Sequence, residues 1–335
     1  MNPPADHPPI PPRKTGVLLI NLGTPNAPEP GAVKDYLREF LSDPRVVEIP
    51  QLVWQPILRG IILNTRPRKS AHAYRQVWTD QGSPLAAITA RQAAALGGAF
   101  GEHVVVDHAM RYGRPAISEK IDRLKGAGCE RILIAPLYPQ YCAATTATAN
   151  DAAFAHLRGM RWQPAVRTLP PYYQDEAYIE ALRSVTEAEL AKLDFAPEAI
   201  VASFHGMPQR TLELGDPYHC HCRKTARLLA EAMGRELIVA FQSRFGRAKW
   251  LEPATDKVLA ELPGRGVRRV AVLAPGFSAD CLETLEELAI RGRDTFLAAG
   301  GERFAYLPCL NDSEPGVDLL RRLIGRELEG WVPPQ

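Results

Sequence analysis

A histidine and two glutamates in this sequence have the side chains and the spacing for proton or metal chemistry. His205 directly follows the apolar run 200–204 and enters a turn rich in glycine and proline. A neutral imidazole can accept a proton near pH 7 or bind a transition metal. Glu283 and Glu287 are four residues apart and would share one face of a helix, where they could relay protons or guide a divalent cation.

Each of these side chains also has a purely structural interpretation. His205 could simply hydrogen-bond the backbone of its own loop. Asp280 has the position of a helix N-cap, and Glu283, three residues later, has the capping-box position, where a carboxylate folds back on the backbone. Acids in a first helical turn also stabilise the helix dipole. The spacing alone therefore leaves structural and chemical roles open.

Basic and apolar residues indicate what such a site could bind. Arg111 follows the strand-like run 103–108, and Arg66 lies in the segment 51–70, which is apolar first and basic at its end. Guanidinium groups suit the carboxylates of a small molecule. The segment 51–70 predicts either a helix packed on a sheet or an exposed apolar lip. The lip would suit a flat apolar ligand and an anionic membrane surface.

Strand-like and helix-like segments alternate along the 335 residues, and these elements must position the chemistry. The ranges that predict strands are 16–21, 103–108, 131–136, 200–204, 237–241 and 269–274. The ranges that predict helices are 32–41, 84–98, 115–127, 176–193, 225–233, 253–262, 280–299 and 314–330. Repeated βα units with right-handed crossovers predict parallel sheets covered by helices, and the length favours two sheets.

We therefore expect an α/β protein with two Rossmann-like domains, each a parallel sheet flanked by helices, and a cleft between them. The expected parts are a flexible proline-rich tail, a first domain and a second domain that carries the catalytic histidine and glutamate: 1–13, 14–165 plus 313–335, and 166–312. Ligands bind outside the carboxyl ends of parallel strands, so the loops that follow the strands should line one cleft.

Composition and missing motifs narrow the function classes. The net charge of +2, from 40 basic and 38 acidic residues, gives no reason to expect a nucleic-acid partner. No secretory signal or membrane-spanning run is recognised, so a cytoplasmic protein with reduced cysteines is expected. No GxGxxG, P-loop or GxSxG pattern occurs, which weakens dinucleotide and hydrolase hypotheses. Cys220 and Cys222 form a Cys-X-Cys pair, a weak indication of a zinc or [2Fe–2S] site.

The chain resembles the ferrochelatases, lyases that insert ferrous iron into protoporphyrin IX in the last step of haem synthesis. Separate motifs carry the resemblance in order along nearly the whole chain: 18–25, 82–84, 138–141, 203–208, 215–218, 242–246 with Trp250, and 275–285. The resemblance implies two Rossmann-like domains around a porphyrin cleft. It favours catalytic roles for the acids over the capping interpretation.

Site residues follow from the resemblance one by one. It implies four catalytic side chains, namely His205, Glu283, Glu287 and Asp280, of which His205 and Glu283 would contact the metal. The implied porphyrin-binding residues are Leu22, Arg66, Arg111, Tyr112, Tyr138, Trp250 and Phe277. Whether His205 accepts protons or ligates iron stays open.

Departures from the family pattern shape the remaining expectations. Position 281 is Cys where some relatives carry His, and no cysteine follows Cys309 to build the family's C-terminal type of cluster. We therefore expect no cofactor beyond substrate Fe²⁺, no [2Fe–2S] cluster and a monomer. Peripheral contact with the inner face of a membrane is expected from the apolar lip. The alternatives are a coproporphyrin or cobalt chelatase, or a porphyrin or haem carrier without catalysis.

Overall fold

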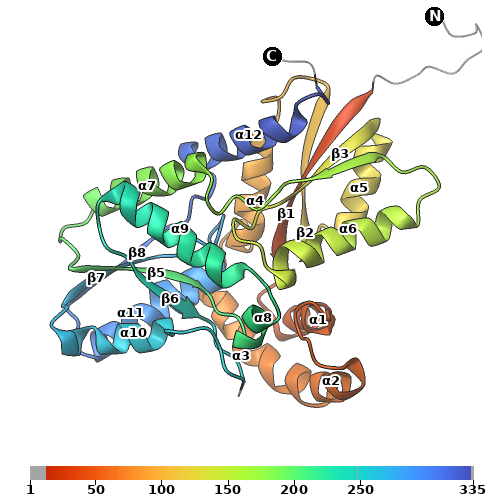
Figure 1. Cartoon of the computed structure of the whole chain (residues 1–335). Helices are drawn as coiled ribbons and strands as arrows, with labels where there is room; N and C mark the ends of the chain where they lie inside the picture. The colour runs from red at the N-terminus through yellow and green to blue at the C-terminus, as the bar shows by residue number, and fades with distance from the viewer. Residues whose placement is uncertain (1–12, 247, 333–335) are drawn as a thin grey trace, which may run out of the picture.

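The structure, a computed structural model, describes residues 13–246 and 248–332 (Figure 1). The expected flexible tail, 1–13, lies outside these residues apart from Arg13. Two four-stranded sheets are parallel throughout, with the orders β2-β1-β3-β4 and β6-β5-β7-β8. Helices flank both sheets. The predicted α/β fold with two parallel sheets is confirmed.

The strands and helices have the following bounds. The first sheet consists of β1 (Lys14–Thr24), β2 (Val104–Gly113), β3 (Cys129–Pro136) and β4 (Ala165–Thr168), and the second of β5 (Ala199–His205), β6 (Ile238–Gln242), β7 (Arg269–Leu273) and β8 (Arg303–Leu307). The α-helices are α1 (Pro30–Ser42), α2 (Gln51–Ile57), α3 (Leu63–Val77), α4 (Pro84–Ala95), α5 (Ile117–Gly126), α6 (Thr148–Arg158), α7 (Glu176–Ala191), α8 (Gln209–Glu213), α9 (Tyr218–Met233), α10 (Thr255–Glu261), α11 (Arg293–Ala298) and α12 (Glu314–Leu328). The π-helices are η1 (Leu58–Ile62), η2 (Ala143–Ala147) and η4 (Glu283–Gly292), and η3 (Pro263–Arg265) is a 3₁₀ turn.

Strand β1 shows how an apolar run becomes a central strand. Val17 and Leu19 face one apolar cluster, whereas Leu18 and Ile20 face another, and all four are fully buried. A parallel strand covered by helices on both faces has no solvent side and is therefore apolar at successive positions. The strand predicted at 16–21 is confirmed for this reason.

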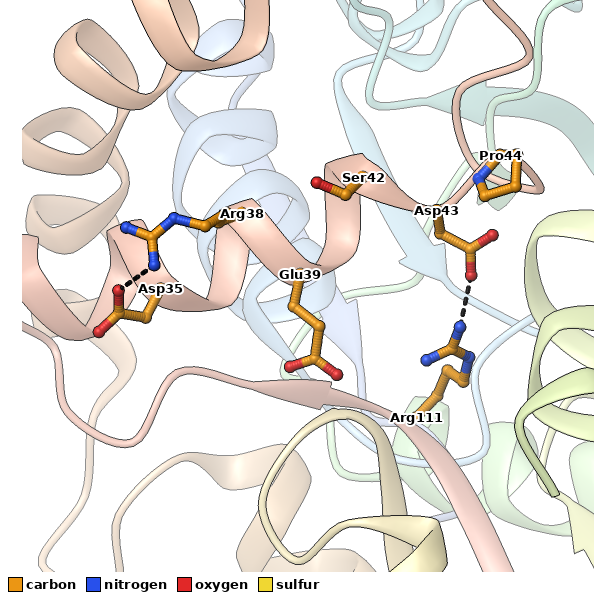
Figure 2. A pocket seen from close by; sticks show the side chains of 7 residues that line it. All are labelled: Asp35, Arg38, Glu39, Ser42, Asp43, Pro44 and Arg111. Carbon is orange, nitrogen blue, oxygen red and sulfur yellow. Dashed lines mark hydrogen bonds and ion pairs between the residues drawn. The ribbon is translucent and has the colours of Figure 1, made fainter. Parts of the chain in front are cut away.

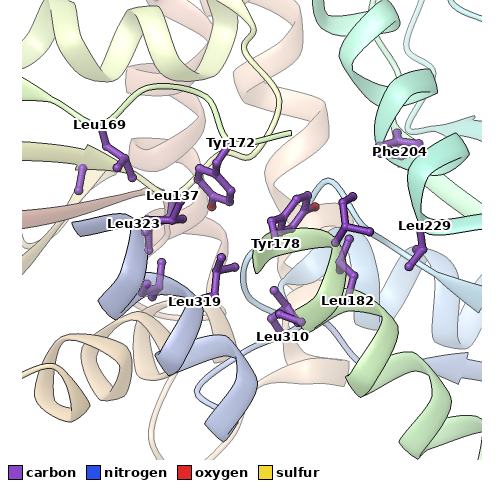
Figure 3. Close-up of a cluster of buried hydrophobic side chains, with 14 of the residues drawn as sticks. Leu137, Leu169, Tyr172, Tyr178, Leu182, Phe204, Leu229, Leu310, Leu319 and Leu323 are labelled. Atoms are coloured by element: carbon purple, nitrogen blue, oxygen red, sulfur yellow. The ribbon is translucent and has the colours of Figure 1, made fainter. Parts of the chain in front are cut away.

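One apolar cluster extends from the first sheet to the second. It contains Leu133 of β3, Phe204 of β5 and side chains of α4, α7, α9 and α12. Figure 3 shows Tyr178 of α7 and Leu323 of α12 within this shared core. Helix α12 packs along α7 and also contacts β3, so the last helix contacts both halves of the chain. The two sheets are thus fastened together by apolar burial.

The change of sheet comes slightly later than predicted. Strand β4 pairs with β3 through four register partners, so the first sheet continues to Thr168. The domain boundary predicted between 165 and 166 falls within this strand. β4 and β8 were both missed in the sequence, because each is short and neither is a continuous buried run.

The shared core makes a testable prediction about cooperativity. Leu323→Ala leaves a cavity between the sheets and should lower the free energy of unfolding by about 2–5 kcal/mol. Urea unfolding followed by tryptophan fluorescence and by circular dichroism should show one transition shifted in both signals. Leu297→Ala, on the exposed side of α11, is the control and should change little. Two separate transitions, with only one of them shifted, would contradict a shared core.

Candidate active site

His205 is the last residue of β5 and lies at the carboxyl edge of the second sheet. It pairs in register with Gln242 at the end of β6. Its half-buried ring lies 6.4 Å from the ring of Phe277, edge to face at 70°. No described residue gives the His205 ring a hydrogen bond, so its nitrogens are free to accept a proton or a metal ion.

The turn after His205 depends on a glycine. The amide of Gly206 donates to the carbonyl oxygen of Gln242 at 2.7 Å. A Cβ on residue 206 would lie 2.4 Å from that oxygen, closer than real contacts allow. An isolated bridge between Pro208 and Trp250 continues the contact and brings the indole to the loop after His205. Glycine at 206 therefore fixes the direction in which the chain leaves the histidine.

Glu283 begins a π-helix, which differs from the α-helix predicted over 280–299. The segment η4 is π-helical over ten residues, and α11 continues it as an α-helix. The N-cap residue is Leu282, and no side chain caps the helix. The capping-box interpretation of Asp280 and Glu283 is therefore wrong. The carboxylate of Glu283 is half-buried and does not serve the helix terminus.

Asp280 is an anchor inside the loop that precedes η4. Its carboxylate accepts hydrogen bonds from the Thr284 hydroxyl at 2.8 Å, the Tyr306 hydroxyl at 2.7 Å and the Asn311 amide at 2.6 Å. The Asn311 amide oxygen in turn accepts the backbone N–H of Asp280 at 2.7 Å. Both carboxylate oxygens are thus occupied, and only 5% of the residue is exposed. This arrangement favours a positioning role for Asp280 over proton transfer.

Glu287 is held by the loop after β6. Its two carboxylate oxygens accept the backbone N–H of Ser243 at 2.8 Å and the Ser243 hydroxyl at 2.5 Å. Arg291 lies 3.8 Å away on the same helix. Ser243 has a φ of 66°, a left-handed conformation that is uncommon for a residue with a side chain. The two bonds from Ser243 therefore hold the Glu287 carboxylate in place, whereas no such pair of bonds among the described residues holds the Glu283 carboxylate.

Two tyrosines from the first domain face Glu283 and were missed in the sequence. Burial raises the pKa of Tyr36 and Tyr74 well above the ordinary value, and the carboxylate of Glu283 contributes to both increases. Burial, and then Glu283, also raises the pKa of the Cys281 thiol. These groups stay protonated at neutral pH. Cys281 is accordingly a neutral thiol here and a poor metal ligand. No sequence signal marked Tyr36 and Tyr74, because both belong to ordinary helix faces.

The predicted wall residues divide into those near His205 and Glu283 and those in the core. Leu22 and Phe277 are half-buried and pack against one small cluster of Leu85, Ile88, Ala279 and Cys281. They form an apolar surface beside His205 and the start of η4. Tyr138 is half-buried, and its hydroxyl has no partner among the described residues. Burial raises the pKa of the Tyr138 hydroxyl, so it remains a donor available to a ligand.

Arg66 and Trp250 meet through the loop after β6. The guanidinium of Arg66 lies 4.2 Å from the ring centre of Phe245. The Trp250 indole donates to the backbone oxygen of Phe245 at 2.9 Å. Burial lowers the pKa of Arg66 from its ordinary value, and the cation–π contact offsets part of the cost of desolvating the guanidinium. This pair brings a charge and an aromatic surface from different halves of the chain together.

Arg111 and Tyr112 are committed to a polar network around Asp43, of which Figure 2 shows the ion pair between Arg111 and Asp43. The Arg111 guanidinium contacts Asp43 at 2.6 Å and Thr148 at 2.7 Å. The Tyr112 hydroxyl donates to Asp43 at 2.9 Å, and the Tyr112 side chain has no exposed surface. Tyr112 is therefore a core residue, which argues against its predicted place in a pocket wall.

The network shares an edge with an open cavity of about 500 Å³. The cavity is lined by Asp35, Arg38, Glu39, Ser42, Asp43, Pro44 and Arg111. Burial would raise the pKa of Asp43, but hydrogen bonds from Thr148 and Tyr112 and the charge of Arg111 bring it below the ordinary value. Asp43 is thus ionised, and it neutralises the guanidinium that was predicted to bind a ligand carboxylate.

The cysteines considered for a cluster have different environments. Cys142 and Cys222 are buried, whereas Cys220 is exposed. Burial raises the pKa of the Cys142 and Cys222 thiols. Across residues 13–246 and 248–332, no three or more His, Cys, Asp or Glu side chains gather in a group that could hold a metal ion.

Solved structures with a similar fold define the class of protein. SirB from Bacillus subtilis, solved with Fe³⁺, aligns over 95% of this chain and 98% of its own with a TM-score of 0.57 at 13% identity. The sirohydrochlorin chelatase SirB from Bacillus subtilis subspecies spizizenii, solved in complex with cobalt, has a TM-score of 0.54 at 14% identity over the same shares. At this identity the likeness establishes a chelatase fold and nothing further.

Sequence comparison identifies the family. The ferrochelatase family profile matches residues 14–328. Ferrochelatases of Agrobacterium fabrum and Rhizobium meliloti are 52% and 54% identical to this chain, with 98% of each sequence covered. The chain belongs to the ferrochelatase family, the lyases that insert iron into protoporphyrin for haem synthesis, as the resemblance in the sequence implied.

The anchoring role of Asp280 can be tested by removing its charge. Asp280→Asn leaves at least one buried donor without an acceptor, which costs about 1–3 kcal/mol for each unpaired group. We expect iron insertion and the urea midpoint to fall together. Asp294→Asn on the exposed face of α11 is the control. A variant that loses activity at full stability would instead assign Asp280 a direct chemical role.

Proposed function

We propose that His205 accepts the pyrrole protons when this chain inserts Fe²⁺ into protoporphyrin IX, and that Glu283 guides the iron. Insertion breaks two pyrrole N–H bonds, forms bonds from the nitrogens to iron and releases two protons. The observation that carries the proposal is the free ring of His205 at the strand end, joined through Gln242 to the start of the Glu283 helix. An imidazole can take each proton in turn and pass it to water.

The apolar wall supports the binding part of this proposal. Leu22 and Phe277 offer the porphyrin a surface on which its macrocycle can be held, and the Tyr138 hydroxyl offers an unused donor. A distorted macrocycle presents its nitrogen lone pairs to the metal, and binding energy at the periphery can offset the strain. The charge of Glu283 acts on Tyr36 of α1 and Tyr74 of α3, which are protonated and uncharged. These two side chains therefore do not neutralise a negative charge on the Glu283 carboxylate.

Replacement of the histidine tests the assignment directly. His205→Ala should bind protoporphyrin IX within several-fold of the unchanged protein but insert iron about 100-fold more slowly, because the base is lost. Porphyrin fluorescence quenching measures binding, and anaerobic haem formation from Fe²⁺ measures insertion. His156→Ala, on α6, is the control. Near-normal insertion by His205→Ala would overturn the proposed role.

The same assay separates the alternative functions. Protoporphyrin IX carries vinyl groups where coproporphyrin carries further propionates, so the apolar wall and lip favour protoporphyrin IX. Running both porphyrins side by side, and Co²⁺ beside Fe²⁺, ranks the substrates. A carrier would bind porphyrin tightly and never metallate it. We also propose that the chain acts as a monomer in the cytoplasm. We propose further that it holds no [2Fe–2S] cluster, since Cys142 and Cys222 lie buried as protonated thiols.

We further propose peripheral membrane contact through the apolar lip, the exposed side chains of α2 and η1. These are Leu52, Val53, Ile57 and Ile61, with Leu52 93% exposed. Trp54 and Leu58 on the opposite side are buried, so the segment both packs on the protein and presents an apolar face. Exposed Arg59, Arg68 and Lys69 border it. None of the described helices has the length and apolarity to cross a bilayer.

A negative charge introduced into the lip tests membrane contact. Leu52→Asp should weaken binding to vesicles of phosphatidylcholine and phosphatidylglycerol by about tenfold or more, because a leucine side chain no longer enters the bilayer. Co-sedimentation measures the bound fraction, and added salt should lower it through the bordering basic residues. Phe154→Asp, exposed on α6, is the matched control. Equal loss in both variants would show that the lip is not the contact surface.

A further inference from the structure

We infer that Gln242 is a positioning residue for iron insertion, which holds the His205 strand end and the start of the Glu283 helix in one fixed arrangement. The inference deepens the proposed function and rests on the roles proposed there for His205 and Glu283. Gln242 is the last residue of β6, and only 3% of it is exposed. It does not need to touch substrate for this role.

Three contacts of Gln242 connect the two sides of the site. Its backbone oxygen accepts the amide of Gly206, the residue directly after His205, at 2.7 Å. Its side-chain Nε2 donates to the carbonyl oxygen of Glu283 at 2.9 Å. Its side-chain Oε1 accepts the Ser203 hydroxyl at 2.7 Å. One residue thus fastens the turn that follows the proposed base to the first residue of the acidic helix.

The orientation of the Gln242 amide follows from these partners. A carbonyl oxygen only accepts, so the group that faces Glu283 must be the NH₂ end of the amide. The amide oxygen then faces Ser203, whose hydroxyl donates to it. Because the Ser203 hydroxyl already donates its hydrogen to Gln242, the Thr255 hydroxyl must be the donor in its bond to Ser203 at 2.8 Å. The chain Thr255, Ser203, Gln242, Glu283 therefore runs in a single direction and cannot reverse without facing two acceptors.

The helix that Gln242 holds has a particular need for an outside anchor. In η4 the backbone bonds run between residues five apart, a geometry rarer than the α-helix and found often at functional sites. The bond from Gln242 to the Glu283 carbonyl fixes the first turn from outside the helix. The next residue, Ser243, holds Glu287 one turn later. Two consecutive residues, the last of β6 and the first of the loop after it, thus set the position of both acids.

Removal of the Gln242 amide tests the inference. Gln242→Leu keeps the approximate size of the side chain and removes both of its hydrogen bonds. We expect kcat for iron insertion, per folded protein and well below the unfolding temperature, to fall about tenfold or more, because small displacements of reacting groups are costly. The affinity for protoporphyrin IX should stay within about threefold, since the apolar wall is untouched. Thr186→Val, at a buried residue of α7, is the control for general loss of stability.

Two further variants keep the test decisive. Ser203→Ala releases only the amide oxygen and should lower kcat by a smaller factor, about three- to tenfold. It also serves if Gln242→Leu does not fold. Gln242→Glu keeps the acceptor for Ser203 and places a negative charge beside Glu283. An ionised carboxylate cannot donate to the Glu283 carbonyl oxygen, so kcat should fall as in Gln242→Leu.

The outcomes distinguish this inference from the proposed function. If His205→Ala is inactive while Gln242→Leu and Ser203→Ala both match Thr186→Val in kcat, the positioning role is overturned and the catalytic assignment stands. If His205→Ala inserts iron normally, the proposed function fails first, whatever Gln242→Leu does. A lower kcat in Gln242→Leu, with porphyrin affinity and the stability of Thr186→Val retained, supports the inference.

Discussion

The apolar core shared by the two sheets is the constraint on which the site depends. His205 and Glu283 come from the second half of the chain, whereas Leu22, Tyr36 and Tyr74 come from the first. Their relative positions are set by side chains such as Leu133, Phe204 and Leu323, which belong to one continuous cluster. Burial of apolar area has no preferred direction, so it holds the halves together but does not by itself fix their orientation.

Hydrogen bonds and an ion pair between the two halves of the chain fix how the halves are oriented. Gln92 of α4 donates to the backbone oxygens of Ser278 and Asn311 at 3.3 and 2.8 Å. Arg91 forms a two-point ion pair with Asp312 next to it. Asn311 bonds to the carboxylate of Asp280 and also donates its backbone N–H to the oxygen of Ser278, so the position of α4 is transmitted to the loop before η4. Buried hydrogen bonds of this kind are costly to leave unmade, which makes the arrangement specific.

The sequence predicted the architecture because the strands are buried on both faces. Runs such as 16–21 and 200–204 have one interpretation as central parallel strands, and the loops after them define the cleft. The π-helix was not predictable, since the residues of η4 are equally compatible with an α-helix. The capping interpretation of Asp280 fails for a related reason: its partners Tyr306 and Asn311 are distant in sequence.

Hydrogen bonds to residues distant in sequence also explain why the sequence alone could not separate ligand-facing residues from core residues. Arg111 and Tyr112 lie near the end of β2, as His205 lies at the end of β5, yet both turn to Asp43, a residue of the loop after α1 that no local pattern connects with them. Tyr36 and Tyr74 lie on helices whose apolar spacing indicated packing only. Family resemblance named positions, but the hydrogen bonds of each side chain decide whether it faces a ligand or the core.

The two glutamates of η4 illustrate how such bonds separate like residues. Glu287 is bonded twice to Ser243 and lies near Arg291, so its charge is already satisfied by the protein. Glu283 faces buried tyrosines whose hydroxyls stay protonated and a thiol that does the same. A divalent cation gains more from a carboxylate without a counter-ion than from one that must first leave its partners. The arrangement therefore favours Glu283 as the acid that meets iron and Glu287 as the acid that holds the helix in place.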